Sequence, residues 1–188
     1  MTTRDALVQA CTDLIAAHGA AALSLRQVAE RVGIKAPSIY VHFANKEALL
    51  AEASRQAAAT LADFLQAADA GGDARTRLLI TAMGYLRFAE VHPSLFALLF
   101  RELPSARHSL DEAPAANSPY RLLLARAADF LGDEHAELLS FGIWSLVHGA
   151  AVLRQTHLRD FSGPIVEATR QNLACLIDGW RLATTTPP

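Results

Sequence analysis

Features typical of membrane-spanning, secreted and disulfide-bonded proteins are scarce in this sequence. No apolar run approaches the roughly 20 residues that a helix needs to cross a bilayer. The N-terminal stretch MTTRDALVQA lacks the basic start and the apolar core of a signal peptide. Only two cysteines occur, Cys11 and Cys175, and their wide separation predicts buried, reduced thiols rather than a disulfide. We therefore expect a soluble protein of the cytoplasm.

Catalytic and metal-binding motifs are also missing. The sequence has no G-x-S-x-G nucleophile elbow, no G-x-x-x-x-G-K-[ST] phosphate loop, no G-x-G-x-x-G turn and no H-E-x-x-H zinc motif. Its seven histidines form no i, i+4 pair, and none has a cysteine nearby at ligand spacing. We expect no catalytic residues, no metal and no cofactor, which argues against an enzyme.

The charge balance gives only a weak indication of the partner. Residues 1–50 carry five Lys or Arg against four Asp or Glu, whereas the remaining 138 residues carry 12 against 15. The first part is therefore slightly basic and the rest slightly acidic. Such a mild asymmetry would support a nucleic-acid partner only together with a structural motif.

Strand patterns are absent, because no run of alternating β-branched residues occurs and almost the whole chain has helical periodicity. We expect an all-α fold of nine helices. Their predicted ranges are residues 4–18, 25–32, 36–42, 45–69, 74–91, 94–100, 120–131, 134–156 and 165–183. Residues 104–119 contain three prolines and few large apolar side chains, which predicts a flexible loop.

The third predicted helix is too short to be stable alone. The preceding helix is expected to start at a capping box of Ser24 and Gln27 and to stop at Gly33. Pro37 suits a first helical position, and Ile39 and Phe43 are expected to point inward. Two helices joined by a tight glycine turn form a helix-turn-helix pattern, whose second helix enters the major groove of DNA.

The outward side chains of this short helix are the candidate DNA contacts. Asn45 is expected to cap the next helix, so that Lys46 and the exposed N–H groups of its first turn would meet a phosphate. The side chains expected to face outward are those of Ala36, Pro37, Ser38, Tyr40, Val41 and His42.

The segment from Arg4 to Leu50 resembles the TetR/AcrR-type bacterial transcriptional regulators. It contains SLRQVAERVGI, a small-Pro-Ser start and IYVHFANKEALL, which is similar to the family pattern L-Y-x-H-F-x-x-K-x-x-L-L. The resemblance implies a TetR-like fold, with a DNA-binding domain at 1–46, a ligand-binding and dimerisation domain at 47–188, and a two-fold dimer. It implies DNA-facing positions for Arg26, Pro37, Ser38, Tyr40, Val41, His42 and Lys46. Further on, WSLVHG (Trp144–Gly149) resembles the subgroup with a WHG-type C-terminal domain.

A ligand cavity would have to be lined by residues of the second domain. His148 is either a satisfied core histidine or a polar group that points into such a cavity. The aromatic residues are either core or cavity lining, which periodicity alone does not decide. The candidate ligand-binding residues are Phe64, Tyr85, Phe88, Phe96, Phe100, Tyr120, Phe141, Trp144 and His148.

These patterns favour a homodimeric repressor that a small, largely apolar molecule releases from a palindromic operator. The last two predicted helices each have a second apolar face, which predicts a dimer seam built from them. One alternative is a DNA-binding activator or a regulator without an effector. The other is a helical binding protein or enzyme in which the N-terminal part is vestigial.

Overall fold

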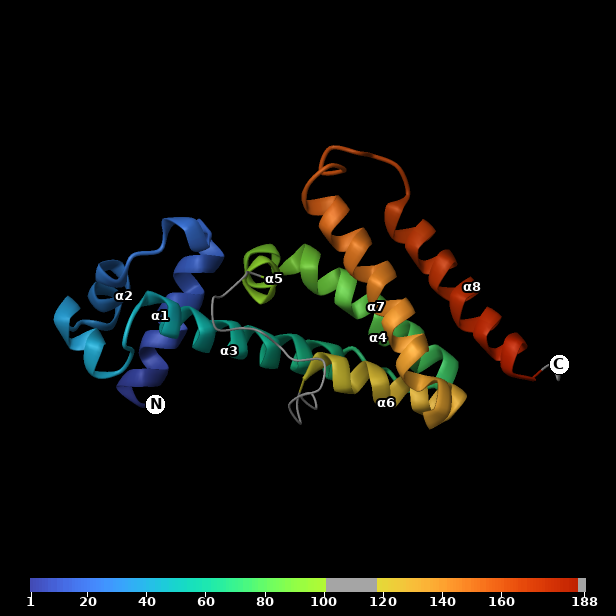
Figure 1. Ribbon diagram of the computed structural model, residues 1–188. Helices are drawn as coiled ribbons and strands as arrows, with labels where there is room; N and C mark the ends of the chain where they lie inside the picture. The colour runs from blue at the N-terminus through green and yellow to red at the C-terminus, as the bar shows by residue number, and fades with distance from the viewer. Residues whose placement is uncertain (101–117, 186–188) are drawn as a thin grey trace. The chain divides into compact units, whose positions relative to one another are not determined.

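The computed structural model describes residues 1–100 and 118–185, and every element in these ranges is a helix (Figure 1). The all-α prediction is therefore confirmed. The elements are α1 (Thr3–His18), η1 (Ala20–Ala22), α2 (Leu25–Val32), η2 (Ala36–Val41), α3 (Lys46–Ala67), α4 (Ala74–Val91), α5 (Pro93–Leu99), α6 (Pro119–Leu131), α7 (Asp133–Gln155) and α8 (Ile165–Thr185).

Two of these elements are 3₁₀ helices, which corrects the prediction in two places. The short helix after Gly33 is 3₁₀ rather than α, and an additional 3₁₀ turn, η1, follows α1. Part of the predicted loop 104–119 is also helical, because Ser118 caps α6 and Pro119 is its first residue. The other residues of that predicted loop lie outside the described ranges.

The helix ends lie where local chemistry predicts them. The Ser24 hydroxyl accepts from the Gln27 N–H while the Gln27 side chain accepts from the Ser24 N–H, so the predicted capping box is present. Gly33 ends α2 in the left-handed conformation, with φ 78° and ψ 26°, which glycine adopts without a Cβ penalty. Asn45 Oδ1 accepts from the Ala48 N–H at 2.8 Å and caps α3.

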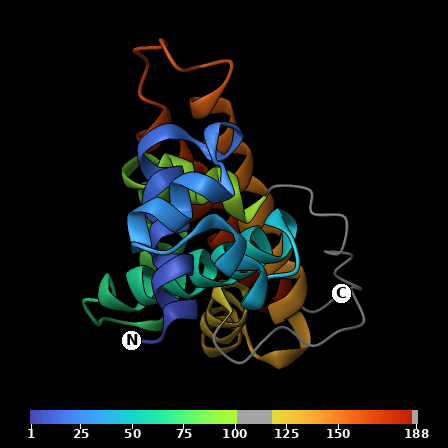
Figure 2. The same cartoon turned by 90° about the vertical axis from the view of Figure 1, so that its left-hand side faces the viewer.

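Packing divides the described residues into two units. The first contains α1, η1, α2, η2, the start of α3 and α5, and the helices before α3 face the viewer in Figure 2. Leu7, Cys11 and Ile15 of α1 are fully buried in it. Burial raises the pKa of the Cys11 thiol to about 12, in agreement with the expected inert cysteine. Cys175 of α8, in contrast, is exposed, which corrects the expectation that both thiols are buried.

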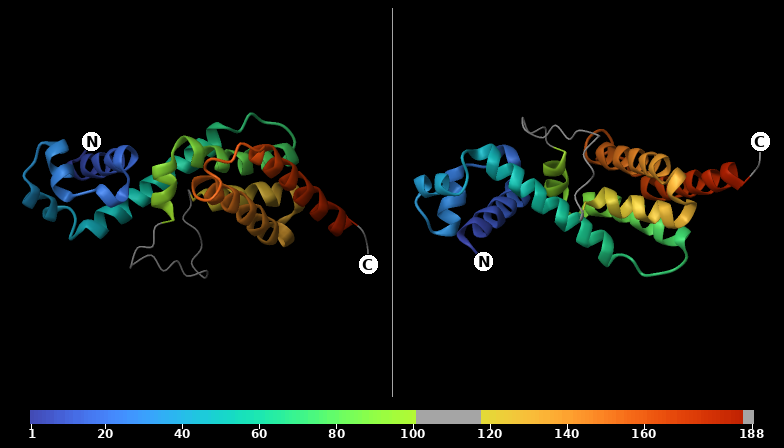
Figure 3. Two further views of the ribbon diagram at one scale, coloured as in Figure 1. Left: turned by 90° about the horizontal axis from the view of Figure 1, so that it is seen from above. Right: turned by 60° about the horizontal axis from the view of Figure 1, so that its bottom comes forward.

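The second unit contains the end of α3 together with α4, α6, α7 and α8. Helix α7 packs against α4, α6 and α8, and these four helices lie alongside one another in both views of Figure 3. Its buried stripe contains Leu139, Ile143, Val147 and Ala151. A bidentate ion pair, at 2.6 Å for both contacts, joins Arg75 of α4 to Asp178 of α8.

Helix α7 also changes one expectation from the sequence. By length and composition alone, Asp133–Gln155 could cross a membrane, although no apolar run of that length was expected. Its packing against three helices of the unit accounts for part of this composition, and 33% of its most apolar stretch is buried within the chain.

Candidate DNA interface and ligand-binding residues

The outer face of η2 presents mostly exposed side chains. Ile39 and Phe43 are buried, at 0% and 4% exposure, as predicted. Tyr40 is 60% exposed and Val41 is 82% exposed. Pro37 and Ser38 are exposed as well, whereas Ala36 and His42 are half-buried. Apolar anchors on one side thus leave a mixed polar and aromatic surface on the other.

Backbone hydrogen bonds close the turns of η2. The Ser38 N–H donates to the Lys35 carbonyl at 2.9 Å, which closes the first turn. The His42 and Phe43 N–H groups both donate to the Ile39 carbonyl, at 2.8 and 2.9 Å. The bond from Phe43 has the α-helical spacing, so the last turn relaxes toward an α-helix just where the second anchor is buried.

Arg26 projects from α2 but is already engaged. Its Nε donates to Glu30 Oε1 at 2.8 Å, and its side chain is 82% exposed. The two residues are four apart on one helix face, a spacing that is visible in the sequence. A DNA contact by Arg26 would therefore compete with Glu30.

Lys46 has a structural partner that sequence reasoning missed. Its Nζ donates to the carbonyl of Leu23, directly before the cap of α2, and the residue is half-buried. This bond ties the first residue of α3 to the start of α2 across 23 positions of sequence. An ammonium group has three N–H donors, so one bond to a carbonyl leaves capacity for a phosphate.

Four predicted ligand-binding residues form one cluster in the second unit. The hydroxyl of Tyr85 lies 3.0 Å from Nδ1 of His148, and Trp144 Nε1 donates to that hydroxyl oxygen at 3.4 Å. The ring centroids of Tyr120 and Trp144 are 5.8 Å apart. Burial lowers the pKa of His148 and raises that of Tyr85, which keeps both groups neutral.

The other predicted ligand-binding residues do not all join this cluster. Phe64 and Phe88 form an edge-on pair, with ring centroids 5.6 Å apart, in the second unit. Phe96 and Phe100 belong to the first unit, and their ring centroids are 5.0 Å apart. Phe141 is 61% exposed on α7, so in this chain it lies at the surface rather than in a cavity wall.

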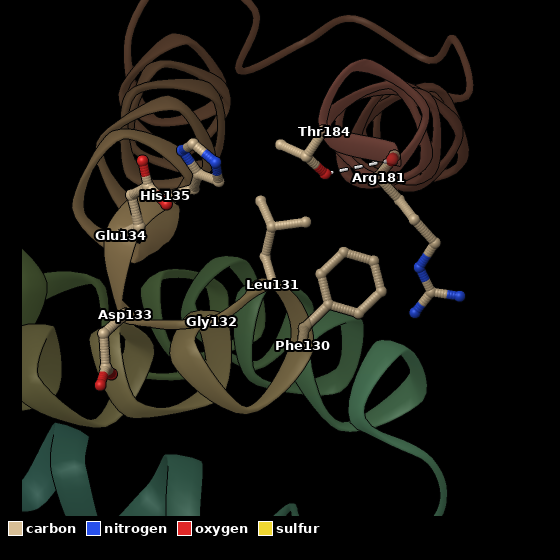
Figure 4. A pocket seen from close by; sticks show the side chains of 8 residues that line it. All are labelled: Phe130, Leu131, Gly132, Asp133, Glu134, His135, Arg181 and Thr184. Carbon is tan, nitrogen blue, oxygen red and sulfur yellow. Dashed lines mark hydrogen bonds between the residues drawn. The ribbon is translucent and has the colours of Figure 1, made fainter. Parts of the chain in front are cut away.

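A pocket that the sequence did not indicate lies at the turn between α6 and α7, beside the last turns of α8 (Figure 4). Its volume is about 560 Å³. The Arg181 guanidinium lies 4.1 Å from the centroid of the Phe130 ring. The lining residues are Phe130, Leu131, Gly132, Asp133, Glu134, His135, Arg181 and Thr184. None of them was among the predicted ligand-binding residues.

Within the described residues, α2, the Gly33 turn and η2 have the order of a helix-turn-helix, whose short second helix presents exposed side chains. Residues 7–53 match the family described as "Bacterial regulatory proteins, tetR family". Residues 78–174, which include the WSLVHG segment, match "Tetracyclin repressor-like, C-terminal domain". The chain belongs to this family of DNA-binding transcriptional regulators, which are not enzymes.

Individual relatives agree with this assignment. An uncharacterised HTH-type transcriptional regulator of Mycobacterium tuberculosis is 23% identical over 159 residues, which cover 84% of this chain and 72% of that protein. A Rhodococcus protein of unknown function shares the fold with a TM-score of 0.75 and 23% identity, over 95% of both chains. The Q116A variant of TetR from Acinetobacter baumannii, solved in complex with minocycline, gives a TM-score of 0.67 at 20% identity, over 96% of this chain and 97% of that one.

Proposed function

We propose that this regulator is a cytoplasmic, homodimeric repressor that a small, largely apolar ligand releases from a palindromic operator. The observation that carries the proposal is the outer face of η2, where Pro37, Ser38, Tyr40 and Val41 are exposed. In this proposal residues 1–46 form the DNA-binding domain, and residues 47–188 bind the ligand and the second subunit.

The DNA contacts divide into base readout and positioning. Ser38 and Arg26 offer hydrogen bonds to base edges, while Ala36 and Val41 offer apolar contact with thymine methyl groups. Tyr40 and Lys46 lie at the end of η2 and the start of α3, where contacts with the phosphate backbone fix the register. Pro37 and His42 complete the DNA-facing surface.

The second subunit would cover apolar side chains of α7 and α8 that this chain leaves exposed. Leu138, Phe141, Val152 and Leu153 are exposed on α7, and Leu182 is 67% exposed on α8. Gly149 of α7 and Gly179 of α8 have open space where a Cβ would lie, so a neighbouring backbone could approach there. Pairing α7 and α8 with their copies forms a four-helix seam with two-fold symmetry.

The ligand would bind near the cluster of Tyr85, Tyr120, Trp144 and His148. Three aromatic rings supply apolar surface, and the Tyr85 hydroxyl and the His148 ring supply the few polar groups that orient a ligand. Phe64 and Phe88, which belong to the same unit, supply further apolar surface. The minocycline complex of the Acinetobacter protein supports a small-molecule effector in a chain of this fold.

Helix α3 links the two activities, because it contributes its first part to one unit and its last part to the other. A ligand that tilts α3 would move the two reading helices of a dimer away from the spacing of successive major grooves. We expect DNA and ligand to oppose each other by about 1–3 kcal/mol.

Selection of duplexes from a random pool by the purified chain, followed by footprinting, tests this proposal. We expect a palindromic consensus with two half-sites about one helical turn apart. Titration of small apolar compounds into the complex should then lower DNA affinity. A sequence-specific complex that no ligand weakens would favour an effector-independent regulator, and a protein that promotes transcription from such a site would favour an activator.

A further inference from the structure

A single arginine joins three elements of the first unit around η2. The guanidinium carbon of Arg4, in the first turn of α1, lies 4.9 Å from the centroid of the Phe43 ring. Nη2 of the same side chain donates to Oε2 of Glu52 on α3 at 2.7 Å. The bond to Glu52 spans 48 positions of sequence, so it is tertiary and not local.

The aromatic partner, Phe43, is one of the two buried anchors of the reading helix. Phe43 directly follows the last turn of η2 and is buried, and its N–H donates to the Ile39 carbonyl. A six-residue 3₁₀ helix has too few internal bonds to hold its own orientation. The position of Phe43 therefore sets the orientation of the exposed side chains on η2.

The positive charge of Arg4 is paired with a carboxylate of the same chain. Glu52 is mostly buried, with 18% side-chain exposure, and it also pairs with Arg55. The hydrogen bond from Arg4 is the main reason why the pKa of Glu52 is lowered. A cation that lies near an aromatic ring within about 6 Å and is also paired with a carboxylate is well suited to fix that ring in place.

We propose that Arg4 is a positioning residue for DNA recognition, which acts through Phe43 and Glu52 and does not bind phosphate. This inference rests on the proposed reading role of η2. If the wild-type chain selects no duplex from a random pool, that reading role is refuted, whereas the variants below test Arg4 alone.

The salt dependence of binding separates positioning from phosphate contact. Each phosphate contact adds about 0.9 to the slope of log affinity against log salt concentration. Arg4→Gln should weaken binding to the selected duplex by about fivefold without a change in this slope. Arg4→Lys keeps the cation and should recover part of the affinity.

Glu52→Gln provides the decisive comparison. It removes a negative charge and releases Arg4, so a phosphate-binding Arg4 would bind DNA more tightly in this variant. If Arg4 instead positions Phe43, the variant removes the carboxylate that holds Arg4. The affinity for DNA should then fall about as much as in Arg4→Gln. Arg55→Gln is the matched control, because Arg55 also pairs with Glu52 but is not the residue over Phe43, and it should bind normally.

All measurements use the full chain at a temperature where circular dichroism shows each variant to be fully folded. Amide hydrogen exchange should show faster exchange in residues 36–43 of Arg4→Gln and Glu52→Gln than in the wild type. The inference holds if both variants lose affinity at constant slope while Arg55→Gln does not. Any other pattern overturns it, including a slope that falls by about 0.9 in Arg4→Gln or tighter binding by Glu52→Gln.

Discussion

The hydroxyl of Tyr85 and Nδ1 of His148 lie 3.0 Å apart, within hydrogen-bond distance of each other. The indole of Trp144 is only a donor, so its N–H donates to the Tyr85 oxygen and leaves the hydroxyl hydrogen for His148. A neutral imidazole allows Nδ1 to accept from that hydroxyl. This arrangement agrees with the direction in which burial shifts the pKa of His148.

Acid should therefore destabilise the folded protein through His148. Its pKa in the folded state lies below the ordinary value of 6.5, so the unfolded chain takes up the proton first. The stability contribution is complete above 6.5 and is lost as the pH falls through the folded-state pKa. Between about pH 8 and pH 5 the Tm of the wild type should fall by about 2–4 °C more than that of His148→Gln. The control is His157→Gln, at an exposed position, and its Tm should depend on pH as that of the wild type does. If both substitutions change this dependence equally, the effect does not come from His148.

Glu30→Gln should strengthen DNA binding. Glu30 is 2.8 Å from Arg26 and adds a negative charge beside the proposed DNA surface. Its removal frees Arg26, and affinity for a selected duplex should rise about two- to threefold at low salt and less at high salt. Fluorescence anisotropy at two salt concentrations measures this change. Glu167→Gln on α8 breaks a similar exposed pair, with Arg170, and should not affect affinity. Weaker binding by Glu30→Gln would show that the Arg26–Glu30 pair supports recognition.

Phe141→Glu should convert the proposed dimer into a monomer. A carboxylate at the centre of an apolar seam would be desolvated without a partner, which is costly for association. Sedimentation velocity should show the mass of one chain, and binding to a palindromic duplex should be lost. Phe161, between α7 and α8, has similar exposure, at 58% against 61%, and Phe161→Glu is the control that should remain dimeric. A dimeric Phe141→Glu would place the interface elsewhere.

Asp69→Asn should lower the thermal stability of the second unit. Asp69 accepts from Arg77 and Arg126, at 2.9 and 2.6 Å, and so joins the end of α3 to α4 and α6. The hydrogen bond from Arg77 is the main cause of the lowered pKa of Asp69. Its stabilising effect is present above the unfolded value of 3.8 and is lost as the pH falls through the folded-state pKa. The Tm at neutral pH should fall by about 5 °C, and Asp63→Asn, at an exposed position of α3, should have little effect. Equal losses in both variants would contradict this role.

Helix boundaries were predictable from the sequence because their causes are local. Ser24 and Gln27 are three residues apart, and Gly33 needs only its own backbone to end α2. The inward orientation of Ile39 and Phe43 followed from their spacing, and the resemblance to a known family supplied the expected DNA-facing positions. These features depend on neighbours along the chain, which a single sequence shows directly.

Features that depend on distant partners were missed. Nothing near Lys46 in the sequence indicates that its ammonium group bonds to the carbonyl of Leu23. Similarly, the apolar periodicity of α7 shows that several faces are apolar, but it does not show which neighbour covers each face. Phe141 was therefore placed in a cavity wall, although this chain leaves it exposed. The preference of η2 for a 3₁₀ helix also has no clear signal in six residues.

The 3₁₀ geometry of η2 has a consequence for how an operator would be read. Three residues complete each turn, so side chains three positions apart are stacked in straight columns along the helix, with a rise of about 2 Å per residue. In ideal 3₁₀ geometry Pro37 and Tyr40 would share one column, and Ser38 and Val41 would share the next. Side chains in one column should therefore contact the same base step. A change in base preference caused by a substitution at Ser38 should be offset more readily by a second substitution at Val41 than by one at the adjacent Tyr40.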